Sequence, residues 1–239
     1  MKGYVHSFES LAALDGEGIR YGVFMQGCPL RCAYCHNPDT WEKGGTEFSP
    51  EQLVKKISRY KLYFGKDGGV TFSGGEPLLQ SEFIRETVPY LKQEGINYAI
   101  DTSGAAELSD AAQYVLQNAQ LVILDLKFWD DKSYKKYTGM GISKVLDTLE
   151  FLEDIKKRTW VRTVVVPGIN DNIEAIGKYL EIFKGKKCIE KYELLGFHTM
   201  GFFKYENMGI KNPFKDTKPL EKETLKELQN FVDNELKKP

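Results

Sequence analysis

The sequence lacks a long apolar run and an excess of charge of one sign. No stretch of the 239 residues approaches the roughly 20 consecutive apolar residues of a membrane span. The first residues, MKGYVHSFES, contain no apolar core of a secretion signal. The 33 Lys and Arg nearly balance the 34 Asp and Glu, which argues against a nucleic-acid groove or an anionic membrane surface. We therefore expect a cytoplasmic protein that binds neither nucleic acid nor membranes.

Cysteine is scarce, and the four present are expected to be cytosolic thiols and not a disulfide framework. Three of them, Cys28, Cys32 and Cys35, lie in the loop GCPLRCAYCHN at 27–37. Three thiolates this close predict a metal site, but a closed zinc site or a four-iron cluster takes four ligands. Zinc would need His36 as a further ligand. An iron–sulfur cluster with one open iron fits better, because that iron can bind a substrate.

Cys188 is a poor candidate for the fourth ligand. It comes just before the sixth predicted strand, whereas the cysteine loop follows the first. The two positions therefore lie at opposite rims, and a strand of six residues spans about 20 Å. We expect Cys188 to be a small buried hydrophobic residue.

Linkers, low-complexity tracts and internal repeats are also absent, which favours a single domain over residues 1–239. Six short apolar runs alternate with segments of helical periodicity, and this alternation predicts parallel strands with right-handed crossovers. The runs are 20–26, 68–73, 96–102, 121–127, 160–166 and 191–197. We expect an α/β fold, a partial (β/α)6 barrel of the TIM type, with a long loop at 198–218 and a final helix at about 220–236.

Polar residues gather where these strands end, which is where α/β barrels carry their chemistry. Asp125 and Lys127 stand two apart on one strand, so both side chains point to one face. Arg162 interrupts another apolar strand and must reach the rim or find an acidic partner, for which Asp15 is the candidate. Together these strand ends predict a site. The others are Ser73-Gly74-Gly75-Glu76-Pro77, Asp101-Thr102-Ser103-Gly104 and His198.

These motifs resemble the radical S-adenosylmethionine (SAM) superfamily. In that superfamily three cysteines hold a [4Fe–4S] cluster, and SAM itself occupies the open iron. The resemblance rests on the cysteine spacing Cys28-x3-Cys32-x2-Cys35 and on GGEP after the second strand. More closely, HSFES, DGEGIR, VTFSGGEPLLQ, DTSG, LDLK, VRTVVVPGIND and ELLGFH resemble the pyruvate formate-lyase-activating enzymes in the same order. That family often has Pro where this chain has Glu17.

The resemblance implies a reaction carried out by cofactors. A reduced flavodoxin or ferredoxin supplies one electron to the cluster, and SAM is cleaved to methionine and a 5′-deoxyadenosyl radical. The radical removes a hydrogen atom from a glycine of pyruvate formate-lyase and leaves a glycyl radical. No side chain is expected to act as a catalytic group, since the cofactors carry the chemistry. We expect a monomer.

The resemblance also implies roles for individual residues. The cluster is held by Cys28, Cys32 and Cys35. SAM is bound by Tyr34, His36, Gly74, Gly75, Glu76, Asp125, Leu126, Lys127 and His198. A monovalent cation, Na+ or K+, lies at Asp101, Thr102, Ile123 and Asp125. The glycine loop of the partner enzyme meets Asp15, Asn37 and Arg162.

The sequence leaves three alternatives open. A zinc-binding interaction module would be colourless, whereas a cluster protein is brown. A radical SAM enzyme could instead act on a small molecule, or the chain could activate another glycyl radical enzyme. Several such activators carry an inserted cysteine-rich cluster domain. Residues 36–68 contain no cysteine, which favours the pyruvate formate-lyase type.

Overall fold

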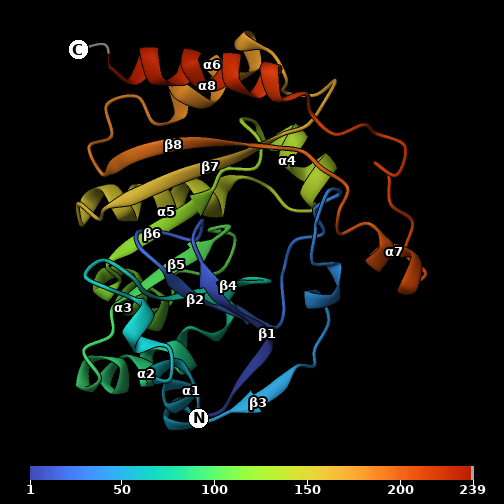
Figure 1. Cartoon of the computed structure of the whole chain (residues 1–239). Coiled ribbons are helices and arrows are strands. Elements are labelled where there is room, and N and C mark those ends of the chain that lie inside the picture. The colour runs from blue at the N-terminus through green and yellow to red at the C-terminus, as the bar shows by residue number, and fades with distance from the viewer. Residues whose placement is uncertain (238–239) are drawn as a thin grey trace.

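The computed structural model describes residues 1–237, and its centre is one curved sheet of eight strands (Figure 1). The strand order is β3-β1-β2-β4-β5-β6-β7-β8. Neighbours from β2 to β8 run parallel, while β1 and β3 are antiparallel additions at one edge. The strands are β1 (Gly3–Ala12), β2 (Arg20–Met25), β3 (Thr46–Phe48), β4 (Gly69–Gly74), β5 (Tyr98–Thr102), β6 (Leu121–Asp125), β7 (Thr159–Val165) and β8 (Ile189–Gly196).

The predicted α/β fold with six parallel strands is confirmed, and the edge strands β3 and β8 do not pair, so the barrel is partial. The two antiparallel strands were not predicted. Strand β1 is interrupted by two irregularities in its pairing with β2, and many of its side chains are exposed. Strand β3 has only three residues, none of them buried. Neither strand therefore shows the continuous apolar run that marks a buried parallel strand.

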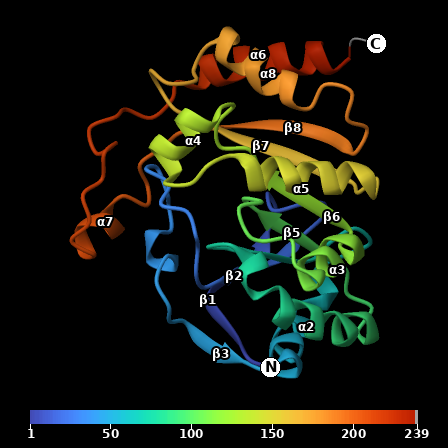
Figure 2. The ribbon, with the colours of Figure 1, turned by 180° about the vertical axis from the view of Figure 1, so that it is seen from behind.

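Helices follow the strands and cover the outer face of the sheet, where Figure 2 shows α2, α3 and α5 in front of the strands. Helix α1 begins with a capping box: the Ser49 side chain accepts from the Gln52 backbone N–H, and the Gln52 side chain accepts from the Ser49 N–H. Among the described residues, no helix is long and apolar enough to cross a membrane. The helices are α1 (Pro50–Ser58), α2 (Ser81–Gln93), α3 (Asp110–Asn118), α4 (Asp131–Thr138), α5 (Ser143–Asp154), α6 (Ile173–Ile182), α7 (Phe203–Asn207) and α8 (Lys222–Leu236).

The interior of the partial barrel is apolar at its floor and polar above it. Side chains alternate along a strand, so residues two apart on β5, β6 and β7 point to the same face. The floor is formed by Ala99, Leu121, Ile123 and Trp160. Two residues further toward the carboxyl ends of these strands, the inward positions are Asp101, Asp125 and Arg162. This layering places the charged groups at the rim where the site was expected.

The segment 13–19, between β1 and β2, enters the barrel interior. The Thr71 hydroxyl donates a hydrogen bond to the Asp15 carbonyl at 2.7 Å, and a Cβ at Gly16 would lie 3.7 Å from a Leu121 methyl. At the outer end of the segment, both carboxylate oxygens of Glu17 accept from Arg158, at 2.7 and 3.1 Å. Glu17, which replaces the family's frequent Pro, therefore helps to fix the segment in place.

Candidate active site

The three clustered cysteines line one cavity at the carboxyl ends of the strands. Their loop is held by helix α4, because the backbone N–H groups of Arg31 and Ala33 donate to the Thr138 and Tyr137 carbonyls, both at 2.8 Å. Cys32, between them, is consequently fixed and buried. At the loop's end, the Asn37 N–H donates to Cys35 Sγ at 3.4 Å.

Cys188 lies elsewhere. Its carbonyl accepts from the N–H of Thr159, the first residue of β7, so Cys188 belongs to the amino-terminal rim. It is only 4% exposed, and it does not line the cavity that the other three share. The structure therefore places Cys188 as a buried residue away from the cysteine loop, as the sequence predicted.

Burial controls the ionisation of the clustered thiols. Burial raises the pKa of Cys28 to about 12, and it also raises the pKa values of Cys32 and Cys35. These thiols hold their protons at neutral pH unless a bound metal displaces them. Within residues 1–237, no three His, Cys, Asp or Glu side chains are arranged around a single ion. The three cysteines instead face a shared space, as a cluster with one cysteine on each of three irons requires.

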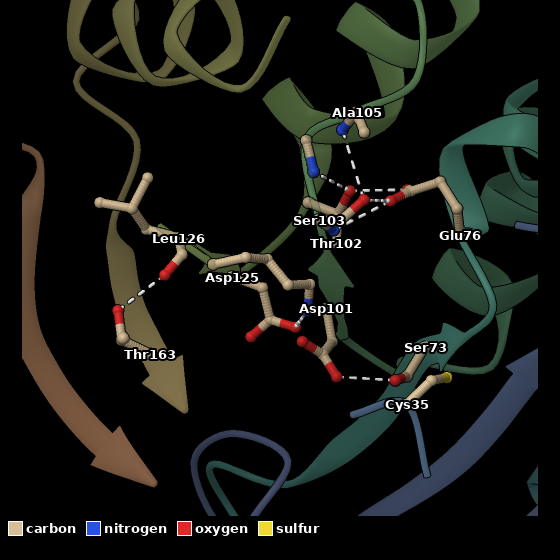
Figure 3. Close-up of polar contacts among 12 residues, drawn as sticks. Cys35, Ser73, Glu76, Asp101, Thr102, Ser103, Ala105, Asp125, Leu126 and Thr163 are labelled. Atoms are coloured by element: carbon tan, nitrogen blue, oxygen red, sulfur yellow. Dashed lines mark hydrogen bonds and ion pairs between the residues drawn. The ribbon is translucent and has the colours of Figure 1, made fainter. Parts of the chain in front are cut away.

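Two carboxylates and one ammonium group form a polar wall of the cavity that the cysteines line. Lys127 Nζ forms an ion pair with Asp125 Oδ2 at 2.6 Å, and the Ser73 hydroxyl donates to Asp101 Oδ2 at 2.6 Å. Figure 3 shows the Asp101 and Asp125 carboxylates next to each other. Burial, and then the charge of Asp125, raise the pKa of Asp101 to about 7. The wall therefore concentrates negative charge that a cation would relieve.

The ammonium group of Lys127 stays charged in this environment. Burial lowers its pKa, but the negative groups around it, Asp125 foremost, outweigh burial and raise the pKa well above its ordinary value. The expected meeting of Asp125 and Lys127 at one face is thus present as a direct ion pair.

Glu76 has a different position from the one expected for a SAM ligand. Its side chain is fully buried and does not line the cavity. The carboxylate accepts from the Thr102 hydroxyl at 2.6 Å and from both the hydroxyl and the backbone N–H of Ser103, the latter at 2.9 Å (Figure 3). It also accepts from the Leu78 N–H at 3.0 Å. Burial raises its pKa, against these hydrogen bonds. The carboxylate therefore joins the ends of β4 and β5, which leaves only the main chain of Glu76 for a ligand.

The two glycines before Glu76 are needed for chain packing. Gly74 has a φ of +106°, and a Cβ there would lie 2.3 Å from the Met25 nitrogen. A Cβ at Gly75 would lie 2.1 Å from the Gly27 carbonyl oxygen. A side chain at Gly74 would push β4 away from β2, and one at Gly75 would push the chain away from the start of the cysteine loop. We expected these glycines to admit a ligand, and the structure adds this second reason for them.

His36 and His198 meet although they come from distant segments. Their rings stack with centroids 3.9 Å apart, and His36 Nε2 donates to the His198 carbonyl at 3.0 Å. Tyr34 and His36 line the cavity. Among the described residues, Tyr34 Oη and His198 Nδ1 are buried without a hydrogen-bond partner. Buried polar atoms of this kind normally have a partner, so they fit a site whose ligand supplies it.

Arg162 does not pair with Asp15, and that expectation was wrong. Its Nε donates to Glu193 Oε2 on β8 at 2.9 Å, and its Nη2 donates to the Leu14 carbonyl. Because β7 and β8 are adjacent and Arg162 faces Glu193 in the register, the acidic partner comes from the next strand. Asp15 lies close by and lines the cavity. Burial raises the pKa of Asp15, while Arg162 opposes that shift.

Lys204 is a contact that the sequence did not reveal. Its ammonium group donates to Asn37 Oδ1 at 2.9 Å and to Asp39 Oδ1 at 3.0 Å. Lys204 lies on α7, inside the irregular stretch 198–218, where no periodicity marked it.

Leu126, expected at the SAM site, is held through its main chain. Its carbonyl accepts from the Thr163 hydroxyl at 2.7 Å, so the main chain of Leu126 is tied to β7 (Figure 3).

Comparison with known proteins identifies the class to which this fold and site belong. Residues 23–180 match the model of the Radical SAM superfamily. A pyruvate formate-lyase-activating enzyme of Clostridium pasteurianum is 44% identical over 232 residues, covering 96% of this chain and 97% of the relative. One of Staphylococcus epidermidis is 38% identical over 241 residues, covering 97% and 96%. The chain belongs to the pyruvate formate-lyase-activating enzyme family of the radical SAM superfamily.

Solved structures agree on the fold. SuiB of Streptococcus suis, bound to its precursor peptide SuiA, superposes with a TM-score of 0.67 at 15% identity, covering 87% of this chain and 44% of SuiB. A domain of a pyruvate formate-lyase-activating enzyme from Bacteroides vulgatus gives a TM-score of 0.57 at 21% identity, covering 70% and 94%. A further SuiB structure contains bound S-adenosylmethionine. At these identities the likeness concerns the fold.

Membership in the superfamily implies a [4Fe–4S] cluster and SAM as cofactors, and it rules out the zinc-binding module. The residues of the cavity fit this pair. Three buried cysteines share it, and Tyr34 Oη, on its wall, lacks a partner among the described residues. The fixed cation of Lys127 complements the carboxylate of an amino acid such as the methionyl part of SAM.

Proposed function

We propose that this chain activates pyruvate formate-lyase by installing a glycyl radical on it. The cluster and SAM, when bound, supply the chemistry: one-electron cleavage of SAM and removal of a hydrogen atom from the partner's glycine. The observation that carries the proposal is the single cavity at the strand ends that joins three cysteines to Asp101, Asp125 and Lys127. The similarity to the activating enzymes, 44% and 38% identity over nearly the full length, supports pyruvate formate-lyase as the partner.

The cavity residues are assigned by the groups they offer. Cys28, Cys32 and Cys35 bind the cluster. For SAM, Lys127 meets the methionyl carboxylate, and the main chain at Gly74, Gly75 and Glu76 receives the ammonium group. The neighbouring residues position the rest of SAM; they are Tyr34, His36, Asp125, Leu126 and His198.

A monovalent cation beside the SAM carboxylate is part of the proposal. The adjacent carboxylates of Asp101 and Asp125 support it, because they repel each other without a counter-ion. Asp101 pairs in register with Ile123, so the Ile123 main chain runs beside it. Thr102 contributes main chain, since its hydroxyl is bound to Glu76. Na+ or K+ would serve equally in this account.

The partner's glycine loop enters through the open side of the barrel. Asp15 and Asn37 line the cavity, and Arg162 lies on the adjoining strand β7, hydrogen-bonded to the segment that carries Asp15. An open barrel suits a macromolecular substrate because a peptide can pass between the unpaired edges. Flavodoxin or ferredoxin supplies the electron. We further propose that the chain acts as a monomeric single domain in the cytoplasm.

The proposal is tested by mixing the anaerobically reconstituted protein with pyruvate formate-lyase, SAM and dithionite. We expect the glycyl radical signal in electron paramagnetic resonance, together with 5′-deoxyadenosine in equal amount. A second glycyl radical enzyme serves as the comparison. Release of 5′-deoxyadenosine without a radical on pyruvate formate-lyase would contradict the proposed partner while leaving the superfamily chemistry intact.

Lys127→Ala should weaken SAM binding. The variant removes the buried cation and leaves Asp125 unpaired beside Asp101, so the pocket loses a carboxylate partner and gains net negative charge. We expect the Kd for SAM to rise at least about tenfold, since charge-assisted hydrogen bonds contribute about 1.5–3 kcal/mol. Anaerobic calorimetric titration measures it. Lys135→Ala, at an exposed ion pair on α4, is the control; equal affinity in both variants would remove Lys127 from the SAM site.

A further inference from the structure

The cysteine loop is covered from outside the cavity by the end of helix α4. Backbone hydrogen bonds tie the residues on both sides of Cys32 to α4: Arg31 N–H to the Thr138 carbonyl and Ala33 N–H to the Tyr137 carbonyl. Figures 1 and 2 both show α4 beside the cysteine loop. One hydrogen bond and the main chain of Ala33 therefore separate the surface of α4 from a cluster ligand.

This end of the molecule is basic. Lys132 and Lys136 are exposed and lie four apart on α4, so their side chains share one face. Within residues 1–237, neither forms an ion pair, and Lys136 Nζ lies 4.7 Å from the centre of the Tyr137 ring. Arg31 is exposed and lies beside the last turn of α4: a Cβ added at Gly139 would lie 3.8 Å from the Cβ of Arg31. Arg31, Lys132 and Lys136 are called the α4 basic patch below.

The acidic residues of α4 are already engaged and do not neutralise the patch. Asp130 caps the helix by accepting from the Ser133 N–H at 2.9 Å and from its hydroxyl at 2.8 Å. Asp131 pairs with Lys135 at 2.6 Å and accepts from the Ile142 N–H. Arg31 pairs with Glu42 at 3.8 Å and donates to the Cys28 and Leu30 carbonyls. Among residues 1–237, the unpaired positive charge of the patch therefore comes from Lys132 and Lys136.

We propose that the α4 basic patch is the docking surface for the acidic one-electron carrier protein that reduces the cluster. None of its residues lines the cavity, so a protein bound there has no opening through which to insert a peptide. An electron donor needs only a short route to a cluster ligand, and the α4 end provides one beside Cys32. Positive charge around that route steers an acidic carrier and orients it.

The proposal rests on the proposed function, because that function requires one electron to be delivered to the cluster. Its test measures SAM cleavage without pyruvate formate-lyase. SAM cleavage is measured with two electron sources, reduced flavodoxin and dithionite, in the double variant Lys132→Glu/Lys136→Glu. Reversal of two charges should lower the flavodoxin-driven rate at low ionic strength by about tenfold or more. Cleavage driven by dithionite should stay within about twofold, because a small reductant needs no docking surface.

A matched control comes from helix α1, at the far end of the sheet in Figure 1. Lys55 and Arg59 are exposed and also stand four apart, so Lys55→Glu/Arg59→Glu changes the net charge equally. We expect this control to keep the flavodoxin-driven rate. Lys132→Gln/Lys136→Gln should give an intermediate loss, and added salt should slow the wild type toward the variants by screening the patch.

Several outcomes would overturn the proposal. One is an unchanged flavodoxin-driven rate in the charge-reversed α4 variant, and another is an equal loss in the α1 control. Slower cleavage with both electron sources would show that α4 only supports the cysteine loop. If the α4 variant cleaves SAM normally with flavodoxin but no longer installs a radical on pyruvate formate-lyase, the patch receives the substrate enzyme instead. A failure of the proposed function looks different, because the wild type would then install no radical with dithionite.

Discussion

Cys32→Ala should leave the anaerobically reconstituted protein without its cluster and reduce SAM cleavage to background. Cys32 is the most buried of the three clustered cysteines, and α4 fixes the main chain on both of its sides. Loss of one thiolate leaves two protein ligands for a four-iron cluster, which is too few to hold it. Iron analysis should give about four irons for the wild type and almost none for the variant. The brown absorbance should disappear with the iron.

Cys188→Ala is the matched control for this result. Cys188 is also buried, but it sits at the amino-terminal rim beside Thr159. Its replacement should cost about 1 kcal/mol of stability, as a small buried group does, and should keep all of the iron. If Cys188→Ala lost iron while circular dichroism showed an intact fold, the assignment of three ligands would fail. It would also fail if Cys32→Ala kept a full cluster.

The parallel strands and the site at their ends could be predicted because both depend on patterns within single segments. Each buried strand is a continuous apolar run, and each ends in residues such as Asp101 or Asp125 that an apolar strand would not otherwise contain. The parallel order then brings those ends to one rim. Lys127 meets Asp125 as expected, although β6 ends at Asp125 and Lys127 lies two residues beyond it.

The partners of buried polar groups could not be predicted because they depend on distances between segments. The sequence near Arg162 does not show that Glu193 faces it from β8, since that depends on the register of two strands. Glu76 belongs to a motif expected to bind SAM, yet its carboxylate joins Thr102 and Ser103. Such contacts arise from side-chain packing, which no periodicity encodes.

Arg162→Lys should separate the two activities of the protein. The guanidinium of Arg162 bridges Glu193 on β8 and the Leu14 carbonyl of segment 13–19, so it joins the last strand to the segment that carries Asp15. A lysine keeps the charge but has a single nitrogen and cannot reproduce the planar, two-sided contact. The variant should therefore pair with Glu193 and release Leu14. Segment 13–19 would then no longer hold Asp15 in place for the partner's glycine loop.

We expect Arg162→Lys to cleave SAM with dithionite at close to the normal rate, because none of its contacts reaches the cysteine loop. Glycyl radical formation on pyruvate formate-lyase should fall by at least about a hundredfold, since a small misplacement of the reacting groups has an effect of that order. Arg85→Lys is the control: it lies on α2, away from segment 13–19, and its ion pair with Glu82 is exposed and contributes little. Equal loss of both activities in Arg162→Lys would place the residue at SAM instead of at the partner. Full retention of both would remove it from the site.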